Sequence, residues 1–158
     1  MAEPLPTVPE PDPASLLEAA TRLHQEGDLV QAGAGYEAVL AADPRNFTAL
    51  HLLGLVRRQQ GRPEEALGFF TEALRLAPRS LLARENLGLA LLDLHRPEEA
   101  LAEFQLALVL KPDDRGARLA CAAALRTLGR PAEALDHLER AVAVHGEFPE
   151  ALLNRAVV

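Results

Sequence analysis

Proline is the residue that most restricts how this chain can fold. Twelve of its 158 residues are proline, and a proline inside a helix costs about 3 kcal/mol. Six of them form two series with a constant step of 34 residues: Pro44, Pro78, Pro112 and Pro63, Pro97, Pro131. Pro149 stands four such steps beyond Pro13. A fixed period of this length is typical of stacked supersecondary units.

Small and aromatic residues keep the same step. The repeating positions are Ala32, Ala66, Ala100 and Ala134; Ala20, Gly54, Gly88 and Ala122; Tyr36, Phe70 and Phe104, followed by Leu138; and Gly27, Gly61 and Gly129, with His95 in the third place. Small residues such as Gly54 and Ala66 allow close helix axes, and one ring per unit fills the remaining space. This pattern explains why aromatic residues make up only 4% of the chain.

Each unit reads as two helices. In the second unit, Leu50, Leu53 and Val56 have helical spacing, and Gly61 can end that helix in a left-handed conformation. Pro63 then occupies the first turn of a second helix, where its missing N–H has no cost. The same helix start and stop signals predict helix pairs over 13–26 and 29–42, 47–60 and 63–77, 81–94 and 97–110, and 115–128 and 131–145.

The residues that recur every 34 positions resemble the sequence pattern of the tetratricopeptide repeat (TPR), a 34-residue helix-turn-helix unit. The resemblance is carried by Leu53-Gly54, Ala66, Phe70, Ala73 and Pro78, and again by Leu87-Gly88, Ala100, Phe104, Ala107 and Pro112. It implies an all-α, right-handed α-solenoid with four full repeats and the first helix of a fifth: 13–46, 47–80, 81–114, 115–148 and 149–158. Residues 1–12 are proline-rich and acidic, and we expect a disordered leader there.

Two units depart from the family pattern. Gly33 and Gly35 lie inside the second helix of the first unit, each at a cost of about 1 kcal/mol relative to alanine. The fourth unit has Arg118 at a usually apolar position, Leu138 for the ring and Gly146 for the last proline.

The resemblance also implies a concave groove, lined by the first helix of each repeat, that binds a peptide or protein segment. Carried onto this sequence, the groove residues are Leu17, Thr21, His24, His51, Leu55, Arg58, Glu85, Leu89, Leu92, Leu119, Ala123 and Arg126. This set has an apolar floor. Arg58, Arg126 and two histidines make it more positive than the whole chain, whose net charge is −7.

Two ligand classes known for the family fit poorly. The lysine, asparagine and arginine clamp for chaperone tails is absent, because its first-unit positions hold Leu17 and Thr21 and its third-unit positions hold Leu82 and Asn86. The asparagine ladder of O-linked N-acetylglucosamine transferase repeats is broken. Its positions here are Glu18, Leu52, Asn86, Ala120 and Asn154.

No catalytic motif is present. The five histidines lack metal-motif spacing, and there is no nucleophile elbow, phosphate loop or dinucleotide fingerprint. We therefore predict no enzyme activity, no cofactor and no metal. Cys121 stands in an apolar column and is predicted to be buried, and Arg84 and Arg118 are predicted to form ion pairs with adjacent helices.

Composition narrows the setting. One cysteine excludes an internal disulfide framework. The absence of a secretory signal and of a long apolar run favours a soluble, cytoplasmic protein without membrane partners. The mild acidity argues against nucleic acid as a partner. Fifteen arginines, a single lysine and abundant alanine indicate a GC-rich bacterial source.

The leading functional hypothesis is a scaffold that binds an extended or helical segment of another protein in the groove. One alternative is the substrate-recruiting N-terminal module of a larger enzyme, such as a glycosyltransferase resembling O-linked N-acetylglucosamine transferase. Another is a structural self-assembly module that associates end to end through 149–158, where Leu152, Leu153 and Val157 lack a partner helix. Ending in mid-repeat also leads us to expect a fragment of a longer protein.

Overall fold

The structure is a computed structural model that describes residues 12–146, and these residues are helical apart from short turns. The helices are α1 (Pro13–Gln25), α2 (Leu29–Ala42), α3 (Phe47–Gln59), α4 (Pro63–Leu76), α5 (Leu81–Asp93), α6 (Pro97–Leu110), α7 (Arg115–Thr127) and α8 (Pro131–His145). Every predicted helix is confirmed, with bounds within one residue. The expected leader, except Asp12, and the partial fifth repeat lie outside the described residues.

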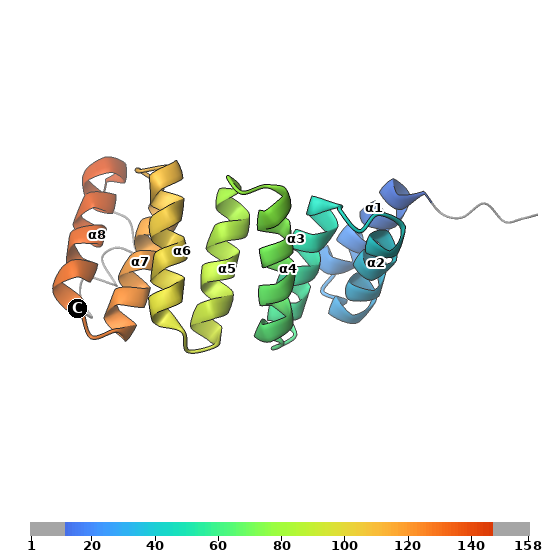
Figure 1. Ribbon diagram of the computed structural model, residues 1–158, viewed down its shortest axis with the longest axis horizontal. Coiled ribbons are helices and arrows are strands. Elements are labelled where there is room, and N and C mark those ends of the chain that lie inside the picture. The colour runs from blue at the N-terminus through green and yellow to red at the C-terminus, as the bar shows by residue number, and fades with distance from the viewer. Residues whose placement is uncertain (1–11, 147–158) are drawn as a thin grey trace, which may run out of the picture.

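The helices stack in one row, each packed on the next along the chain (Figure 1). Each odd-numbered helix also contacts the next odd-numbered helix, and no comparable contact joins successive even-numbered helices within the described residues. The odd-numbered helices are therefore closer together and form the inner, concave side of the solenoid. We call their free surface the inner face and that of the even-numbered helices the outer face.

Helix starts follow two rules. Four helices begin with proline in the first turn: α1, α4, α6 and α8. The other four begin after a capping residue whose side chain accepts a hydrogen bond from the backbone N–H three residues on: Asp28, Asn46, Ser80 and Asp114. Both devices deal with backbone N–H groups that have no partner inside the helix.

The turn within each repeat has one repeating geometry. At the end of α3, Gly61 N–H donates to Arg58 C=O and Arg62 N–H donates to Arg57 C=O, the pair of bonds of a Schellman motif. The motif needs a positive φ at its glycine position. Gly61 has φ 72°, and His95 takes the same place after α5 with φ 57°, as its column predicts.

The rings fix the spacing of paired helices. A Cβ added to Gly54 would lie 2.6 Å from the ring of Phe70, and one added to Gly88 would lie 2.4 Å from the ring of Phe104. The closest neighbours of these glycines are therefore the rings, which fill the space that the small residues leave. Any residue with a Cβ at Gly54 or Gly88 would collide with the ring in its present position.

The first repeat solves the same packing problem differently. Ala20 stands where the next two repeats have glycine, and the close approach moves to α2. A Cβ on Gly35 would lie 2.7 Å from the Cβ of Ala20. The intrinsic helix cost of Gly35 is thus accepted because any larger residue would collide with α1.

Candidate functional site

Four of the predicted groove residues meet at one hollow on the inner face. This α5–α7 hollow has a volume of about 390 Å³. Its walls are Glu85, Leu89, Phe104, Gly116, Leu119, Ala120 and Ala123. Glu85, Leu89, Leu119 and Ala123 were predicted from the family pattern, whereas Phe104 comes from α6 and could not be found by following first-helix positions.

A carboxyl pair stands at the edge of the α5–α7 hollow. Burial, a hydrogen bond to Asp114 and the Asp114 charge raise the pKa of Glu85 from 4.5 to about 7, and Lys111 opposes them. Burial also opposes ionisation of Asp114, but hydrogen bonds from Lys111, the Ala117 N–H and Glu85 together lower its pKa. Between pH 4.5 and about 7, Glu85 is therefore the member of the pair that holds the shared proton. Asp114 was missed because its capping position carries no groove signal.

A second hollow lies between α1 and α3 and has a volume of about 430 Å³. It contains two predicted groove residues, Leu17 and Thr21, and its remaining walls are Glu18, Arg22, Gln25, Thr48 and Leu52. The Thr21 hydroxyl donates to Leu17 C=O at 2.7 Å. This hollow is more polar than the α5–α7 hollow and does not continue directly into it.

The two hollows are separated by a buried cross-link. His51 is only 5% exposed and its ring stacks parallel to that of Phe47 at 6.0 Å between centroids. Its Nε2 shares a 2.8 Å hydrogen bond with the amide nitrogen of Asn86, one repeat on. Burial lowers the pKa of His51. The ring leaves little surface for a ligand, and the only asparagine of the ladder column among the described residues is engaged here.

Other predicted groove residues also make contacts between repeats. His24 Nε2 and Gln59 Oε1 are 2.8 Å apart, and Arg58 Nε donates to Asp93 Oδ2 at 2.5 Å. Leu55 and Leu92 are half-buried against the core. The charge of Arg58 is therefore already paired within the chain.

Arg126 differs from Arg58. It is exposed on α7, and among residues 12–146 no carboxylate forms an ion pair with it. Of the two cationic side chains predicted for the groove, Arg126 is thus the one without a carboxylate partner within residues 12–146.

Three further predictions concern residues away from the inner face. Arg84 forms the expected ion pair with a neighbouring helix, at 2.6 Å from Glu103 of α6. Arg118 instead donates to Pro112 C=O at 2.6 Å and lies 3.9 Å from Asp113, both in the loop before α7. Cys121 is fully buried, and burial raises the pKa of its thiol to about 12, which confirms its role as a core residue.

The described residues contain no cluster of three or more His, Cys, Asp or Glu side chains that could hold a metal ion. Within the same part of the chain, every helix is too short or too polar to span a bilayer.

The fold and the repeated columns define a class of protein, the solenoids of stacked helical hairpins. Residues 11–156 match the family model of the tetratricopeptide repeat, and the chain belongs to this family. Proteins of this family bind other proteins, so the chain is a protein-interaction scaffold.

Solved structures agree with this assignment. A tetratricopeptide repeat protein from Parabacteroides merdae ATCC 43184 is 25% identical, with a TM-score of 0.84 over 92% of this chain. This chain spans only 58% of that protein. MamA AMB-1 is 28% identical, with a TM-score of 0.75, covering 90% of this chain and 78% of its own. Another MamA structure, at 23% identity and a TM-score of 0.81, covers 87% of this chain and 81% of its own and shows the fold alone. No curated protein matches the sequence significantly.

Proposed function

We propose that the inner face binds a segment of a partner protein at the α5–α7 hollow, with an apolar side chain of the ligand on Leu89, Leu119 and Ala123. The observation that carries the proposal is the hollow itself. It gathers four predicted groove residues around an open apolar surface, whereas His51 and Arg58 have partners within the chain.

Charge gives the ligand a direction. Arg126 lies one turn beyond Ala123 on α7 and has no carboxylate partner within the described residues. Glu85 lies at the other side, and with a pKa of about 7 its carboxyl is about half protonated at neutral pH. We propose that an acidic group of the ligand pairs with Arg126, while a carboxyl oxygen of Glu85, whose proton is donated to Asp114, accepts a hydrogen bond from a ligand N–H.

The test is affinity capture with matched variants, followed by identification of the bound proteins by mass spectrometry. The double variant Leu89→Ala, Leu119→Ala removes the apolar walls, and we expect it to lose the partner that the unchanged protein retains. Val109→Ala is the control, because Val109 is a 75% exposed apolar side chain on α6. If the double variant, folded by circular dichroism, kept the partner at full affinity, the hollow would not be the binding site.

A second variant tests the charge. Arg126→Glu should weaken binding of the captured partner, and the loss should shrink as salt is added, because an exposed ion pair is screened. Arg58→Glu would give the larger loss of affinity if the site lay nearer the middle of the inner face.

A cytoplasmic location and a bacterial source stay predictions from the sequence.

A further inference from the structure

On the outer face, a buried arginine fills the groove between α2 and α4. Arg57 of α3 is 7% exposed. It forms ion pairs with Glu37 of α2 and with Glu65 of α4, the latter at 3.2 Å. A Cβ on Gly33 would lie 2.8 Å from its Nη1, so the guanidinium rests against α2 where no side chain intervenes. This closed groove was missed in the sequence, although an arginine among apolar residues of α3 was a visible signal.

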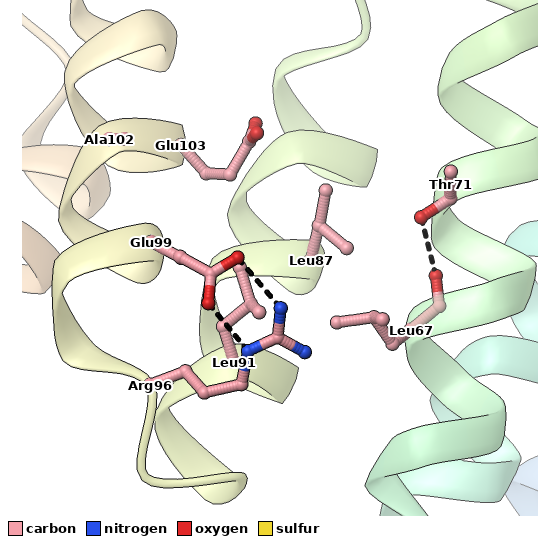
Figure 2. A pocket seen from close by; sticks show the side chains of 8 residues that line it. All are labelled: Leu67, Thr71, Leu87, Leu91, Arg96, Glu99, Ala102 and Glu103. Carbon is pink, nitrogen blue, oxygen red and sulfur yellow. Dashed lines mark hydrogen bonds and ion pairs between the residues drawn. The ribbon is translucent and has the colours of Figure 1, made fainter.

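One repeat further on, the equivalent groove between α4 and α6 is open. Leu91 stands at the position of Arg57, and Thr71 stands at that of Glu37. A hollow of about 330 Å³ remains, lined by Leu67, Thr71, Leu87, Leu91, Arg96, Glu99, Ala102 and Glu103. Figure 2 shows Leu67 reaching from α4 toward the guanidinium of Arg96, with Leu87 and Leu91 on α5 between the two neighbouring helices. We call this the open outer groove.

The open outer groove keeps the carboxylate that the closed groove uses. Glu99 occupies the repeat position of Glu65, and it accepts two hydrogen bonds from Arg96, at 2.6 and 2.7 Å (Figure 2). In the closed groove, Glu65 pairs with Arg62 and with Arg57 together. A carboxylate has about four acceptor positions, so Glu99 has room for a second guanidinium as Glu65 does.

We propose that the open outer groove binds an arginine side chain presented by a partner protein. The methylenes of that arginine pack on Leu67, Leu87 and Leu91, and its guanidinium pairs with Glu99, as Arg57 pairs with Glu65. Two properties favour arginine over lysine: its planar fork bonds a carboxylate through two N–H groups, and its stem covers apolar surface. This surface lies on the opposite side from the α5–α7 hollow, and its test is independent of that site.

The probe is a blocked tripeptide with arginine between two glycines, compared with the same peptide carrying citrulline. Citrulline keeps the shape of arginine but has no charge. Binding is followed by amide chemical shifts of the full chain in ¹H–¹⁵N NMR spectra at millimolar peptide. We expect saturable shifts in α4, α5 and α6 around Leu67, Leu91 and Ala102, and a loss of about tenfold or more with citrulline.

Variants locate the interaction. Glu99→Gln should lower the affinity for the arginine peptide by about tenfold. Glu98→Gln, which changes an exposed neighbour on the same turn, should leave that affinity unchanged. Leu91→Arg copies the closed groove and should abolish binding. Leu91 is only 4% exposed, so the Leu91→Arg result is used only if the NMR spectrum shows that the variant is folded. If it is not folded, the binding measured with Glu99→Gln decides the test. Equal affinity for arginine and citrulline, unchanged binding by Glu99→Gln, or shifts confined to α1, α3 and α7 would each overturn the proposal.

Discussion

The N-terminal and C-terminal halves of the inner face put the same repeat positions to different uses. His51 and Glu85 occupy one position in successive repeats, yet His51 is a buried cross-link to Asn86 and Glu85 borders an open hollow. Arg58 and Arg126 also share a column. Arg58 is paired with Asp93 of the next repeat, and Arg126 is exposed.

The difference shows that a groove position borders an open hollow where the helix one repeat on leaves space beside it. Each inner-face residue meets the helix one repeat on, so its availability depends on a residue about 35 positions further along, as for His51 with Asn86 and Arg58 with Asp93. Both inner-face residues of the second repeat, His51 and Arg58, have such a partner in the third repeat. Between α5 and α7 small residues, Gly116, Ala120 and Ala123, stand opposite α5 and leave space.

The largest expected effect comes from removing the cross-link. His51→Ala leaves a cavity between Phe47 and Phe70 and an unpaired Asn86 amide, so we expect a loss of about 2–4 kcal/mol in the free energy of unfolding. Leu119→Ala, in the open half, should cost less than half as much because its side chain is only half-buried. Urea denaturation measures both. Equal losses would show that the two halves do not differ as described.

The second and third repeats, one in each half, pack a glycine against a phenylalanine ring in the same way, and glycine substitutions test this. Gly54→Ala and Gly88→Ala each push a Cβ against a phenylalanine ring, and each should lower the free energy of unfolding by about 1–3 kcal/mol. The matched control is Gly68→Ala, since a Cβ there meets nothing within 4 Å and should raise stability by about 0.5–1 kcal/mol. Clearly unequal losses at Gly54 and Gly88 would mean that the halves differ in their cores as well.

The pH dependence should have opposite signs at the two equivalent positions. The pKa of Glu85 is raised from 4.5 to about 7, so the folded state holds a proton that the unfolded state has released, and this part of the stability is lost as pH rises through that interval. The pKa of His51 is lowered from 6.5. Its contribution is therefore lost as pH falls below 6.5.

Glu85→Gln should remove the loss of stability between pH 4.5 and about 7. After solvent screening is allowed for, we expect this to change the free energy of unfolding by about 1 kcal/mol. Thermal unfolding at a series of pH values measures it, and Glu98→Gln, an exposed carboxylate on α6, serves as control. A profile for Glu85→Gln that parallels the unchanged protein over this range would show that Glu85 does not hold the proton.

The smallest effect lies between the halves, at the turn after α5. His95 is held at φ 57°, a left-handed conformation that costs a residue with a side chain about 1 kcal/mol. His95→Gly should therefore raise the free energy of unfolding by about 0.5–1 kcal/mol and leave binding at the α5–α7 hollow unchanged. Calorimetry and the capture assay would report this, and a fall in melting temperature would contradict it.

Much of the fold could be predicted from the sequence because its signals are local. Proline in a first turn, a capping side chain and a left-handed residue at a helix end act within a few residues of where they stand, so Pro63, Asn46 and even His95 mark their turns directly. The ring column likewise predicted that Phe70 would be buried.

The candidate site could be predicted only in part. The family pattern places Leu89, Leu119 and Ala123 on the inner face, and these residues do line the α5–α7 hollow. It also includes His51, which is buried, and it omits Phe104 and Asp114. A position in a repeat says which face a side chain points toward, but it carries no information on what stands opposite.

The sequence by itself determined the helices, their turns and their stacking order, because repeated local signals and a 34-residue period leave few other ways to bury the apolar faces. Only the tertiary structure decided which surfaces stay open. Arg57 closes one outer groove and Leu91 leaves the next one open, and His51 is buried whereas Glu85 is not. The physical reason is that each outcome depends on distances between helices of different repeats, which are set by packing between small residues and rings.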